Sequence, residues 1–176
     1  MENAVPYRIN SKVVETAKVP DIDIRLVSLD DTFELRKAVL RPWITLEDSR
    51  KLYGSVGEHF HVGALLDGRV VSTAAFMIDA HPDYSAEFGP LQWRLRGMAS
   101  DPALQGQGLG GRVLAFGVAE VARRLGVSGE SSATVWCSGR TGAQGFYERH
   151  GFQPIGELYQ TAGTGPHFVF WRKVAA

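Results

Sequence analysis

Apolar and polar residues alternate along several short segments of the chain, which is the pattern of strands with one buried face. The clearest example is the pair of segments 61–66 and 69–78, which flank Asp67-Gly68. Because Asp-Gly supplies the positive backbone angles of a tight turn, this stretch predicts an antiparallel hairpin. Alternation or short apolar runs predict further strands at residues 22–29, 91–100, 133–137, 152–160 and 168–174.

Segments whose apolar residues recur at the spacing of a helix lie between these predicted strands. Apolar residues recur at intervals of four, three and four through Leu114, Val118, Val121 and Leu125. We therefore expect an amphipathic helix over residues 108–125, which Gly126 ends. Shorter helices are predicted over residues 33–39, 45–53 and 141–150. The order of elements predicts an α/β (α+β) fold, a mixed sheet with helices on its faces.

The domain organisation follows from length and periodicity. Residues 1–20 show no period and are interpreted as an N-terminal arm. The other residues, 21–176, are few enough to share a single core, so we expect one domain.

Composition narrows the class of protein. Nineteen basic residues against nineteen acidic ones leave no net charge, which argues against a nucleic-acid partner. The chain has one cysteine, Cys137, and an N-terminus without a secretory signal pattern, so we expect a cytoplasmic protein. No apolar run is long enough for a bilayer span, and we expect no membrane partner. His59 and His61 lack a third ligand at a usual spacing, so no metal site is expected.

A glycine-rich segment, residues 101–111, leads into the predicted long helix. Gly106, Gly108 and Gly110 let the main chain approach a ligand closely, and the first amides of a helix have no partner within it. With the positive end of the helix dipole, these donors favour an anion such as a pyrophosphate. The alternative is that the glycines only cap and turn the chain.

Two other phosphate-binding motifs fit this segment less well. Gly106, Gly108 and Gly111 satisfy the G-x-G-x-x-G pattern of dinucleotide-binding proteins. In that fold, however, the strand runs directly into the first glycine, whereas residues 101–105 intervene here. A Walker loop is excluded because no Gly-Lys-Ser/Thr follows the glycines. A nicotinamide or flavin oxidoreductase is therefore disfavoured.

The segment from Gln105 to Gly110 resembles the Q/R-x-x-G-x-G/A loop of the GNAT acetyltransferases. Residues 143–152, Ala-Gln-Gly-Phe-Tyr-Glu-Arg-His-Gly-Phe, resemble a second motif of that family, and Gly165-Pro166-His167 resembles a C-terminal segment of one subgroup. The resemblance covers roughly residues 22–174. It implies a mostly antiparallel sheet of about six or seven strands, with a splay that holds acetyl-CoA. It also implies acetyl transfer from acetyl-CoA to a primary amine of a small molecule or peptide.

The resemblance also implies where the cosubstrate would lie. Coenzyme A would enter a splay between the strands that end at Ser100 and Cys137, with pantetheine near Met98 and Ser100. The pyrophosphate would lie on the amides of residues 105–110. The residues expected to contact the cosubstrate are Met98, Ala99, Ser100, Gln105, Gly106, Gln107, Gly108, Leu109, Gly110, Gly111, Arg140, Phe146 and Tyr147. Arg140 stands where many family members have Asn, and a solvated surface arginine is the alternative.

Tyr147 aligns with the tyrosine that acts as general acid in the family. A phenol with a pKa near ~10 is close enough to a thiol near ~8.5 to protonate a leaving thiolate. The alternative for Tyr147 is core packing beside Phe146. No base is identified by spacing, and we rank His167 ahead of other polar groups near strand ends. Those other groups are Asp79, His81 and Glu87.

The sequence bears on two alternatives to catalysis by direct attack of the amine. Covalent catalysis by Cys137 is disfavoured, because a cysteine at the end of an apolar strand is usually an inert packing group. A non-catalytic acyl-CoA-binding or regulatory module is the alternative to an enzyme, and Tyr147 favours the enzyme. A homodimer is compatible with the sequence, which carries no sign of the oligomeric state.

Overall fold

The computed structural model of the chain describes residues 21–54, 57–161 and 165–176. In chain order the elements are β1 (Asp23–Val27), α1 (Phe33–Val39), α2 (Leu46–Tyr53), β2 (His59–Leu66), β3 (Arg69–Ile78), α3 (Ser85–Phe88), β4 (Gln92–Ser100), α4 (Leu109–Ser128), β5 (Ser132–Arg140), α5 (Gln144–Arg149), β6 (Gln153–Thr161) and β7 (Gly165–Ala175). Single turns of 3-10 helix precede α1, α4 and α5 at Asp30–Thr32, Pro102–Leu104 and Thr141–Ala143. The predicted N-terminal arm, residues 1–20, lies outside the described residues.

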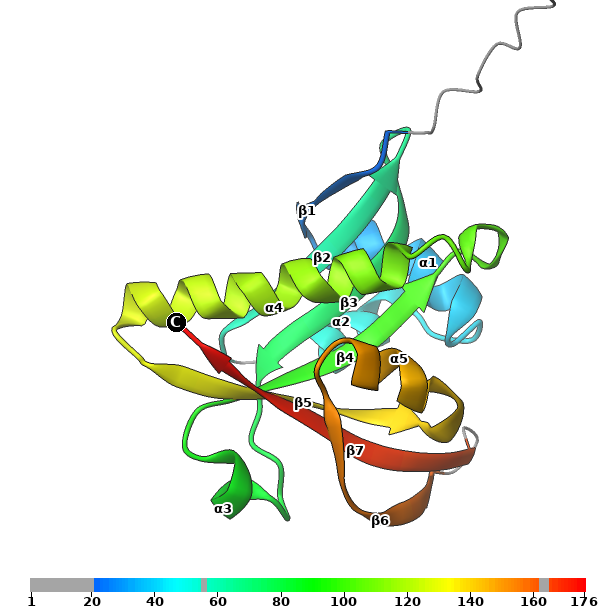
Figure 1. The fold of residues 1–176 in the computed structure, drawn as a ribbon. Helices are drawn as coiled ribbons and strands as arrows, with labels where there is room; N and C mark the ends of the chain where they lie inside the picture. Colours follow the sequence, from blue (N-terminus) through cyan, green and yellow to red (C-terminus); the bar gives the residue numbers. More distant parts are fainter. Residues whose placement is uncertain (1–20, 55–56, 162–164) are drawn as a thin grey trace, which may run out of the picture.

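The strands form one sheet in the order β1-β2-β3-β4-β5-β7-β6 (Figure 1). Every neighbouring pair is antiparallel except β4 and β5, which run parallel. The sequence prediction of a mixed, mostly antiparallel sheet of six or seven strands is confirmed. The predicted hairpin is confirmed as well, and its turn has positive φ at Asp67 (50°) and Gly68 (77°).

The parallel pair β4–β5 stays together only at its start. Gln92, Trp93 and Arg94 pair with Thr134, Val135 and Trp136, and beyond these residues the two strands separate. From there on β4 pairs only with β3, and β5 only with β7. The sheet is therefore open between the second half of β4 and the end of β5, as the predicted splay requires.

A bulge in β4 accompanies this separation. Arg96 pairs with Ala75 and Ala99 with Thr73, so two residues of β4 stand opposite one residue of β3. Gly97 lies in the bulge with a φ of 56°. An extra residue bends its strand and increases the local twist. The bulge thus turns β4 away at the point where it leaves β5.

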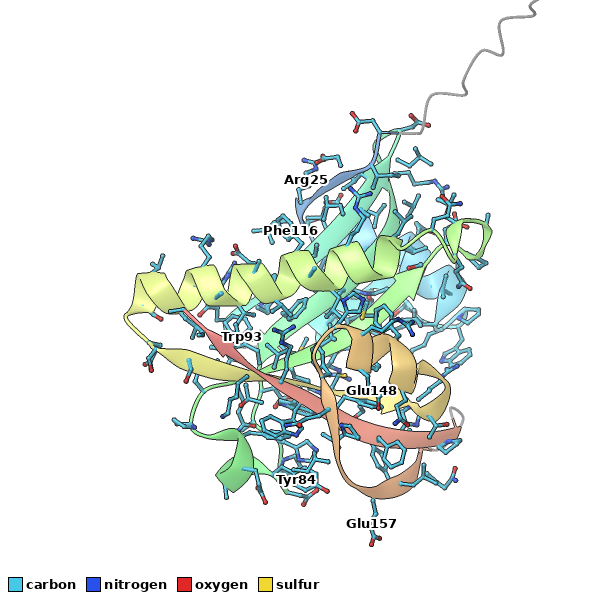
Figure 2. The ribbon with its side chains drawn as sticks, in the orientation of Figure 1. Arg25, Tyr84, Trp93, Phe116, Glu148 and Glu157 are labelled. Carbon is cyan, nitrogen blue, oxygen red and sulfur yellow. The ribbon has the colours of Figure 1, made fainter. Side chains whose placement is uncertain are left out.

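Helices cover both faces of the sheet, as predicted. Helix α4 crosses one face (Figure 1), which we call the α4 face, and its Val113, Leu114 and Val121 join the main hydrophobic core. Trp93 of β4 points beneath this helix (Figure 2). On the opposite face, Leu35 of α1 packs against β2, β3 and β4, whereas Phe88 of α3 packs against Trp136 and Val169. Since helices cover both faces, the strand side chains are mostly buried on both sides of the sheet.

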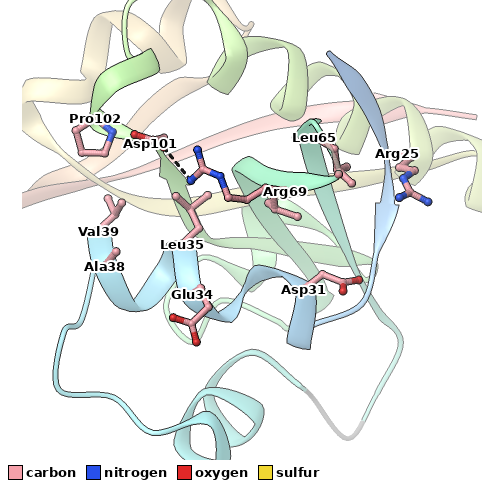
Figure 3. A pocket seen from close by; sticks show the side chains of 12 residues that line it. Arg25, Asp31, Glu34, Leu35, Ala38, Val39, Leu65, Arg69, Asp101 and Pro102 are labelled. Carbon is pink, nitrogen blue, oxygen red and sulfur yellow. Dashed lines mark hydrogen bonds and ion pairs between the residues drawn. The ribbon is translucent and has the colours of Figure 1, made fainter. Parts of the chain in front are cut away.

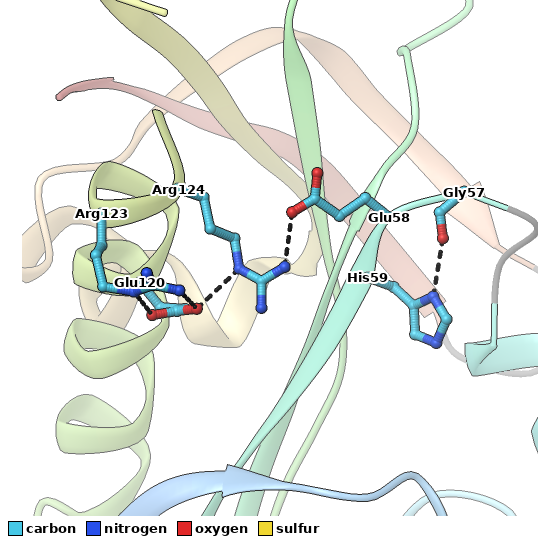
Figure 4. Close-up of polar contacts among 6 residues, drawn as sticks. All are labelled: Gly57, Glu58, His59, Glu120, Arg123 and Arg124. Atoms are coloured by element: carbon cyan, nitrogen blue, oxygen red, sulfur yellow. Dashed lines mark hydrogen bonds and ion pairs between the residues drawn. The ribbon is translucent and has the colours of Figure 1, made fainter. Parts of the chain in front are cut away.

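Two contacts hold α4 close to the sheet. Gly117 faces the Phe76 ring so closely that a Cβ atom there would lie 2.1 Å from Phe76 Cε2. Near the other end of the helix, Arg124 donates to Glu120 at 2.8 Å and to Glu58 at 2.6 Å (Figure 4). Its guanidinium carbon also lies 4.6 Å from the centre of the Phe60 ring. The small residue Gly117 at one point and the ion pairs of Arg124 at the other fix the position of α4 on the sheet.

The structure corrects several predicted boundaries. Helix α4 continues through Gly126 and ends at Ser128, because the left-handed C-cap is Gly129 with a φ of 77°. Strand β5 extends to Arg140 instead of ending at Cys137, since β7 pairs with it along that whole length. The short helix α3 lies in a stretch that carried no helical period. Local periodicity misses the last two features because the partners that stabilise them are distant in sequence, whereas the end of α4 depends on which of two nearby glycines caps it.

The two helical glycines yield a matched prediction. Gly117→Ala should destabilise the protein by about 1–3 kcal/mol, because the added carbon overlaps Phe76. Gly126→Ala should stabilise it by about 0.5–1 kcal/mol, since no atom lies within 4 Å of its Cβ position and alanine loses less backbone entropy. Urea unfolding of both variants gives the sign of each change. Equal stabilisation by the two substitutions would contradict the close contact at Gly117.

Candidate functional site

The glycine-rich segment begins with a short, well-anchored turn. Asp101 accepts a hydrogen bond from the Ala103 amide at 3.0 Å, and its carboxylate pairs with Arg69 at 3.1 Å. After the turn, the backbone passes through positive φ at Gly106 (80°) and Gly108 (77°). Gly108 is also the N-cap of α4. The glycines are needed here for backbone conformation, because a Cβ at either position would meet nothing within 4 Å.

The amides of this segment are available to a ligand. The first helical hydrogen bond of α4 runs from the Arg112 amide to the Gly108 carbonyl at 3.1 Å, and no side chain caps the helix. Over the described part of the chain, the amides of residues 106–111 have no hydrogen-bond acceptor. Free donors at the positive end of a 20-residue helix suit the two phosphates of a pyrophosphate. The residues present therefore fit the phosphate part of coenzyme A.

Helix α5 lies against this end of α4. The Phe146 ring is 3.9 Å from the position of a Cβ atom on Gly110, and Ser100 Oγ is 3.6 Å from the same point. The His150 ring would be 2.8 Å from a Cβ on Gly111. Gly111 thus permits close packing of the His150 ring on the first turn of α4, whereas Ser100 and Phe146 lie at ordinary contact distance beside Gly110. Of the predicted cosubstrate residues, Ser100, Gly110, Gly111 and Phe146 are brought together.

Tyr147 lies in the interior at the floor of the opening. Its side chain is 8% exposed, and its ring stacks on Phe170 with centroids 4.9 Å apart. Gly139 makes room for the ring, since a Cβ there would lie 2.6 Å from Tyr147 Cε2. The hydroxyl lies near the sulfur of Cys137, close enough that each group shifts the pKa of the other, and Cys137 is the first residue of β5 beyond its pairing with β4. Tyr147 is therefore a core residue whose polar end reaches the splay.

Burial sets the protonation of this pair. It raises the pKa of the Tyr147 phenol well above its ordinary value, and the nearby Cys137 sulfur raises it further. Burial also raises the pKa of the Cys137 thiol to about 12, although the nearby Tyr147 hydroxyl opposes this shift. Both groups are protonated near neutral pH. Tyr147 is thus in the form that an acid needs, and Cys137 is not a thiolate nucleophile.

The two candidate histidines differ in their available lone pairs. His167 Nδ1 lies 2.8 Å from the Gly165 carbonyl oxygen, which can only accept, so the neutral ring keeps a lone pair on Nε2. His81 Nδ1 instead accepts a hydrogen bond from the Asp83 amide at 3.1 Å, so its proton lies on Nε2. Burial also lowers the pKa of His81. Of these two rings, only His167 has a nitrogen free to accept a proton.

His167 lies on the other face of the sheet from Tyr147. Phe170 of β7 contacts Tyr147, and residues an odd number apart on a strand point to opposite faces. Asp79, another candidate base, pairs with Arg94 at 2.9 Å. Glu87 is exposed on α3, and Arg140 is exposed at the end of β5. The predicted acid and the first-ranked base therefore lie on opposite faces of the sheet.

The sequence reasoning missed a group of arginines near the same opening. Arg36, Arg41 and Arg96 join Arg94 on the face opposite α4. Arg94 and Arg96 alternate on β4 with the core residues Trp93 and Leu95. That alternation was the available signal, because two arginines at a spacing of two on a strand share one face.

A hollow of about 540 Å³ lies at the end of the sheet, between α1 and the β2–β3 hairpin (Figure 3). It touches the start of the glycine segment only through Asp101 and Pro102, and none of the predicted cosubstrate residues lines it. Among the described residues, no three His, Cys, Asp or Glu side chains are grouped as a metal site would need. No helix of the described residues is long and apolar enough to cross a membrane. The free amides and the splay are therefore the chemically distinctive features of the structure.

Comparison with known proteins gives the family. The family model described as "Acetyltransferase (GNAT) domain" matches residues 57–154, more than half of the chain. This chain belongs to the GNAT acetyltransferase family. It is accordingly an acyltransferase, and acetyl-CoA is its cosubstrate. This result excludes the alternative of a dinucleotide-binding oxidoreductase.

Individual relatives agree with the family. The chain is 28% identical over 151 residues to "Uncharacterized N-acetyltransferase YitI" of Bacillus subtilis (strain 168), covering 86% of this chain and 95% of that protein. An acyl-CoA N-acyltransferase from Pseudomonas aeruginosa has a similar structure, with a TM-score of 0.62, 22% identity, and coverage of 88% and 99%. An aminoglycoside 6'-N-acetyltransferase complexed with coenzyme A gives a TM-score of 0.64 at 14% identity, with coverage of 88% and 98%. At these identities the structural likeness shows the fold.

The state of Cys137 can be tested directly, because it is the only cysteine of the chain. With a pKa of about 12, roughly one thiol in 10⁴ is ionised at pH 8, against about a quarter of thiols of ordinary pKa. A disulfide reagent at pH 8 should therefore react on the order of a thousandfold more slowly with the native protein than with the urea-unfolded protein. Equal rates in the two states would show that Cys137 is neither buried nor protonated as described.

Proposed function

We propose that this GNAT protein transfers an acetyl group from acetyl-CoA to a primary amine of a small molecule or peptide, by direct attack of the amine. The observation that carries the proposal is the opening between β4 and β5. It has free helix amides at one end and the hydroxyl of a buried, protonated tyrosine at its floor. Anion binding and an acid at one gap in a sheet are what acetyl transfer from a thioester needs.

The cosubstrate would be held mainly by main-chain groups. The free amides from Gly106 to Gly110, with Gly111 behind them, would bind the pyrophosphate. The Gln105 amide, which the sequence prediction included, already donates to the Pro102 carbonyl at 3.4 Å. Beyond Arg94, the edge of β4 that faces β5 has no strand partner, so backbone groups at Met98, Ala99 and Ser100 are available to the pantetheine amides. Phe146 supports the loop from α5. Arg140 is retained as a candidate contact at the far end of β5.

Acetyl-CoA supplies a thioester, whose carbonyl carbon accepts an amine and whose sulfur leaves as a thiolate. In our proposal Tyr147 donates its hydroxyl proton toward that sulfur as charge develops there. The phenol is protonated at neutral pH even at its ordinary pKa. Burial raises that pKa and makes the phenol a weaker acid, so proton transfer depends on the negative charge that develops on the sulfur. The stacked Phe170 ring and the small residue Gly139 hold the phenol in place.

The amine must lose a proton before or during attack. A lysine-like amine has a pKa near ~10.4, so about one molecule in a few thousand is uncharged at neutral pH. His167 is our candidate for the proton acceptor, because the Gly165 carbonyl orients its ring and leaves Nε2 with a lone pair. His167 lies on the face of the sheet away from Tyr147. This position supports an arrangement in which the amine loses its proton on one face and the leaving sulfur receives a proton from the other.

Ligand-dependent stability tests the cosubstrate. Acetyl-CoA at a hundredfold excess over its dissociation constant should stabilise the fold by about 2.7 kcal/mol. For a domain of this size, that corresponds to a rise of roughly 5 to 11 °C in melting temperature. NAD should give no comparable shift. A shift with NAD and none with acetyl-CoA would reverse the assignment.

A matched pair of glycines links that shift to the glycine segment. Gly108 and Gly129 cap the two ends of α4, both with a φ of 77° and both with open space at the Cβ position. Replacing either by alanine should cost about 1–2 kcal/mol of stability. Only Gly108→Ala should also reduce the acetyl-CoA shift, since only that end carries the free amides. Equal shifts in both variants would place the pyrophosphate elsewhere.

Tyr147→Phe tests the acid. The variant should keep the acetyl-CoA shift but lose about 10²- to 10⁴-fold in kcat, measured as release of coenzyme A thiol over a panel of amines. Tyr84→Phe, which removes a hydroxyl elsewhere, should leave kcat unchanged. Unchanged turnover in Tyr147→Phe would reject the acid role. Acetyl-CoA binding by a wild-type protein with no turnover would instead favour the non-catalytic alternative.

A further inference from the structure

Four arginines gather on the sheet face opposite α4, next to the opening between β4 and β5. We call them the arginine cluster: Arg36 from α1, Arg41 from the segment between α1 and α2, and Arg94 and Arg96 from β4. Arg94 is the last residue of β4 that pairs with β5, and Arg96 is two residues further on. Both point away from the α4 face, to which Trp93 and Leu95 belong. The cluster thus borders the splay from the side that the glycine segment does not occupy.

The end of α2 contacts three members of the cluster, two of them through Tyr53, its last residue. The guanidinium carbon of Arg36 lies 4.4 Å above its ring, and an Arg41 nitrogen donates to its hydroxyl at 2.6 Å. Arg96 donates to the carbonyl of the neighbouring Leu52 at 3.2 Å. These contacts hold the side chains with donors to spare, because each guanidinium carries five N–H groups.

The cluster has too few carboxylates for its charge. Asp79 pairs with Arg94 at 2.9 Å. Among the described residues, no carboxylate forms an ion pair with Arg36, Arg41 or Arg96. Burial lowers the pKa of Arg96, and the charges of Arg94 and Arg41 lower it further. Grouped cations with one counter-ion are costly, and an anion arriving between them would relieve that cost.

Arg36 has a different role from the others. It is 1% exposed, and it donates to the Gly97 carbonyl at 3.1 Å and to Thr32 Oγ1 at 2.6 Å. His61 Nδ1 lies 3.4 Å from an Arg36 guanidinium nitrogen. Burial and Arg36 lower the pKa of His61 to about 3, so His61 is neutral. Arg36 therefore positions the bulge and adds positive potential, while the partly exposed Arg41 and Arg96 are able to touch a ligand.

The geometry points to an acceptor amine that carries an anionic group, a carboxylate or a phosphate, which Arg41 and Arg96 bind. This inference rests on the proposed function. A thioester that enters from the glycine segment on the α4 face meets an amine on the opposite face, where the cluster and His167 lie. Planar guanidinium groups bind carboxylates and phosphates through paired hydrogen bonds. The same charges repel polycationic amines, so polyamines and aminoglycosides should be poor acceptors.

The test compares acceptors that differ in the anion, with kcat/KM expressed per uncharged amine because a carboxylate raises the pKa of the neighbouring amine. The pairs are an α-amino acid with its carboxamide, and an amino sugar phosphate with the free amino sugar; spermidine is the cationic reference. In at least one pair the anionic member should show a kcat/KM at least about tenfold higher, which corresponds to about 1.4 kcal/mol. The pair with the larger preference identifies whether carboxylate or phosphate is recognised. Equal or lower values for the anionic member of both pairs would overturn the inference.

Substitutions assign the preference to the cluster. Arg96→Gln and Arg41→Gln should raise KM for the anionic acceptor about tenfold or more and change the neutral one little, because only the charge-assisted contact is lost. Arg25→Gln is the control, since Arg25 is an exposed arginine on β1 that pairs with Asp23. An anionic preference that survives both cluster substitutions would reject the assignment.

A binding measurement separates this inference from the proposed function. Melting shifts produced by each acceptor, with coenzyme A present, need no turnover. A larger shift with the anionic member, reduced in Arg96→Gln, supports the inference even if the rates are low. Turnover of spermidine with no response to anions would leave acetyl transfer standing and refute the anionic acceptor. An anion response without any turnover would support the site and count against the enzyme.

Discussion

The structure depends on the short pairing between β4 and β5. Three residue pairs join these strands, and beyond Arg94 and Trp136 each strand keeps a partner on one side only. The carbonyl of Gly97, within the bulge that bends β4 at this point, accepts a hydrogen bond from the buried Arg36. A sheet normally hides its backbone polar groups within its ladders. Here part of one ladder is open, so main-chain donors and acceptors are left for a ligand.

The two faces of the sheet then carry different chemistry at the same gap. On the α4 face, unpaired amides follow Gly106 and Gly108, and the Tyr147 hydroxyl reaches Cys137 from the core. On the other face lie arginine side chains and the oriented ring of His167. A donor and an acceptor molecule could meet through such a gap without competing for one pocket.

Several residues serve packing and the site together. Tyr147 fills the core through its stacked ring, which leaves only its hydroxyl to do chemistry, and Gly139 is small so that the ring fits. Arg36 shapes the β4 bulge and also raises the local positive potential. For such residues the choice between a structural and a functional role is not exclusive. Their substitution should be interpreted with stability and ligand binding measured side by side.

Local rules within the sequence determined most of the fold and part of the site. Asp67-Gly68 specified a turn, and alternation specified the strands that flank it. The glycine segment specified a helix start with free amides, because backbone freedom and unpaired donors are properties of a few neighbouring residues. The sequence did not determine that β5 reaches Arg140, or that Arg36, Arg41 and Arg96 meet beside Tyr53. Tertiary structure decided these features, because strand pairing, burial and the summed field of charges depend on residues far apart along the chain.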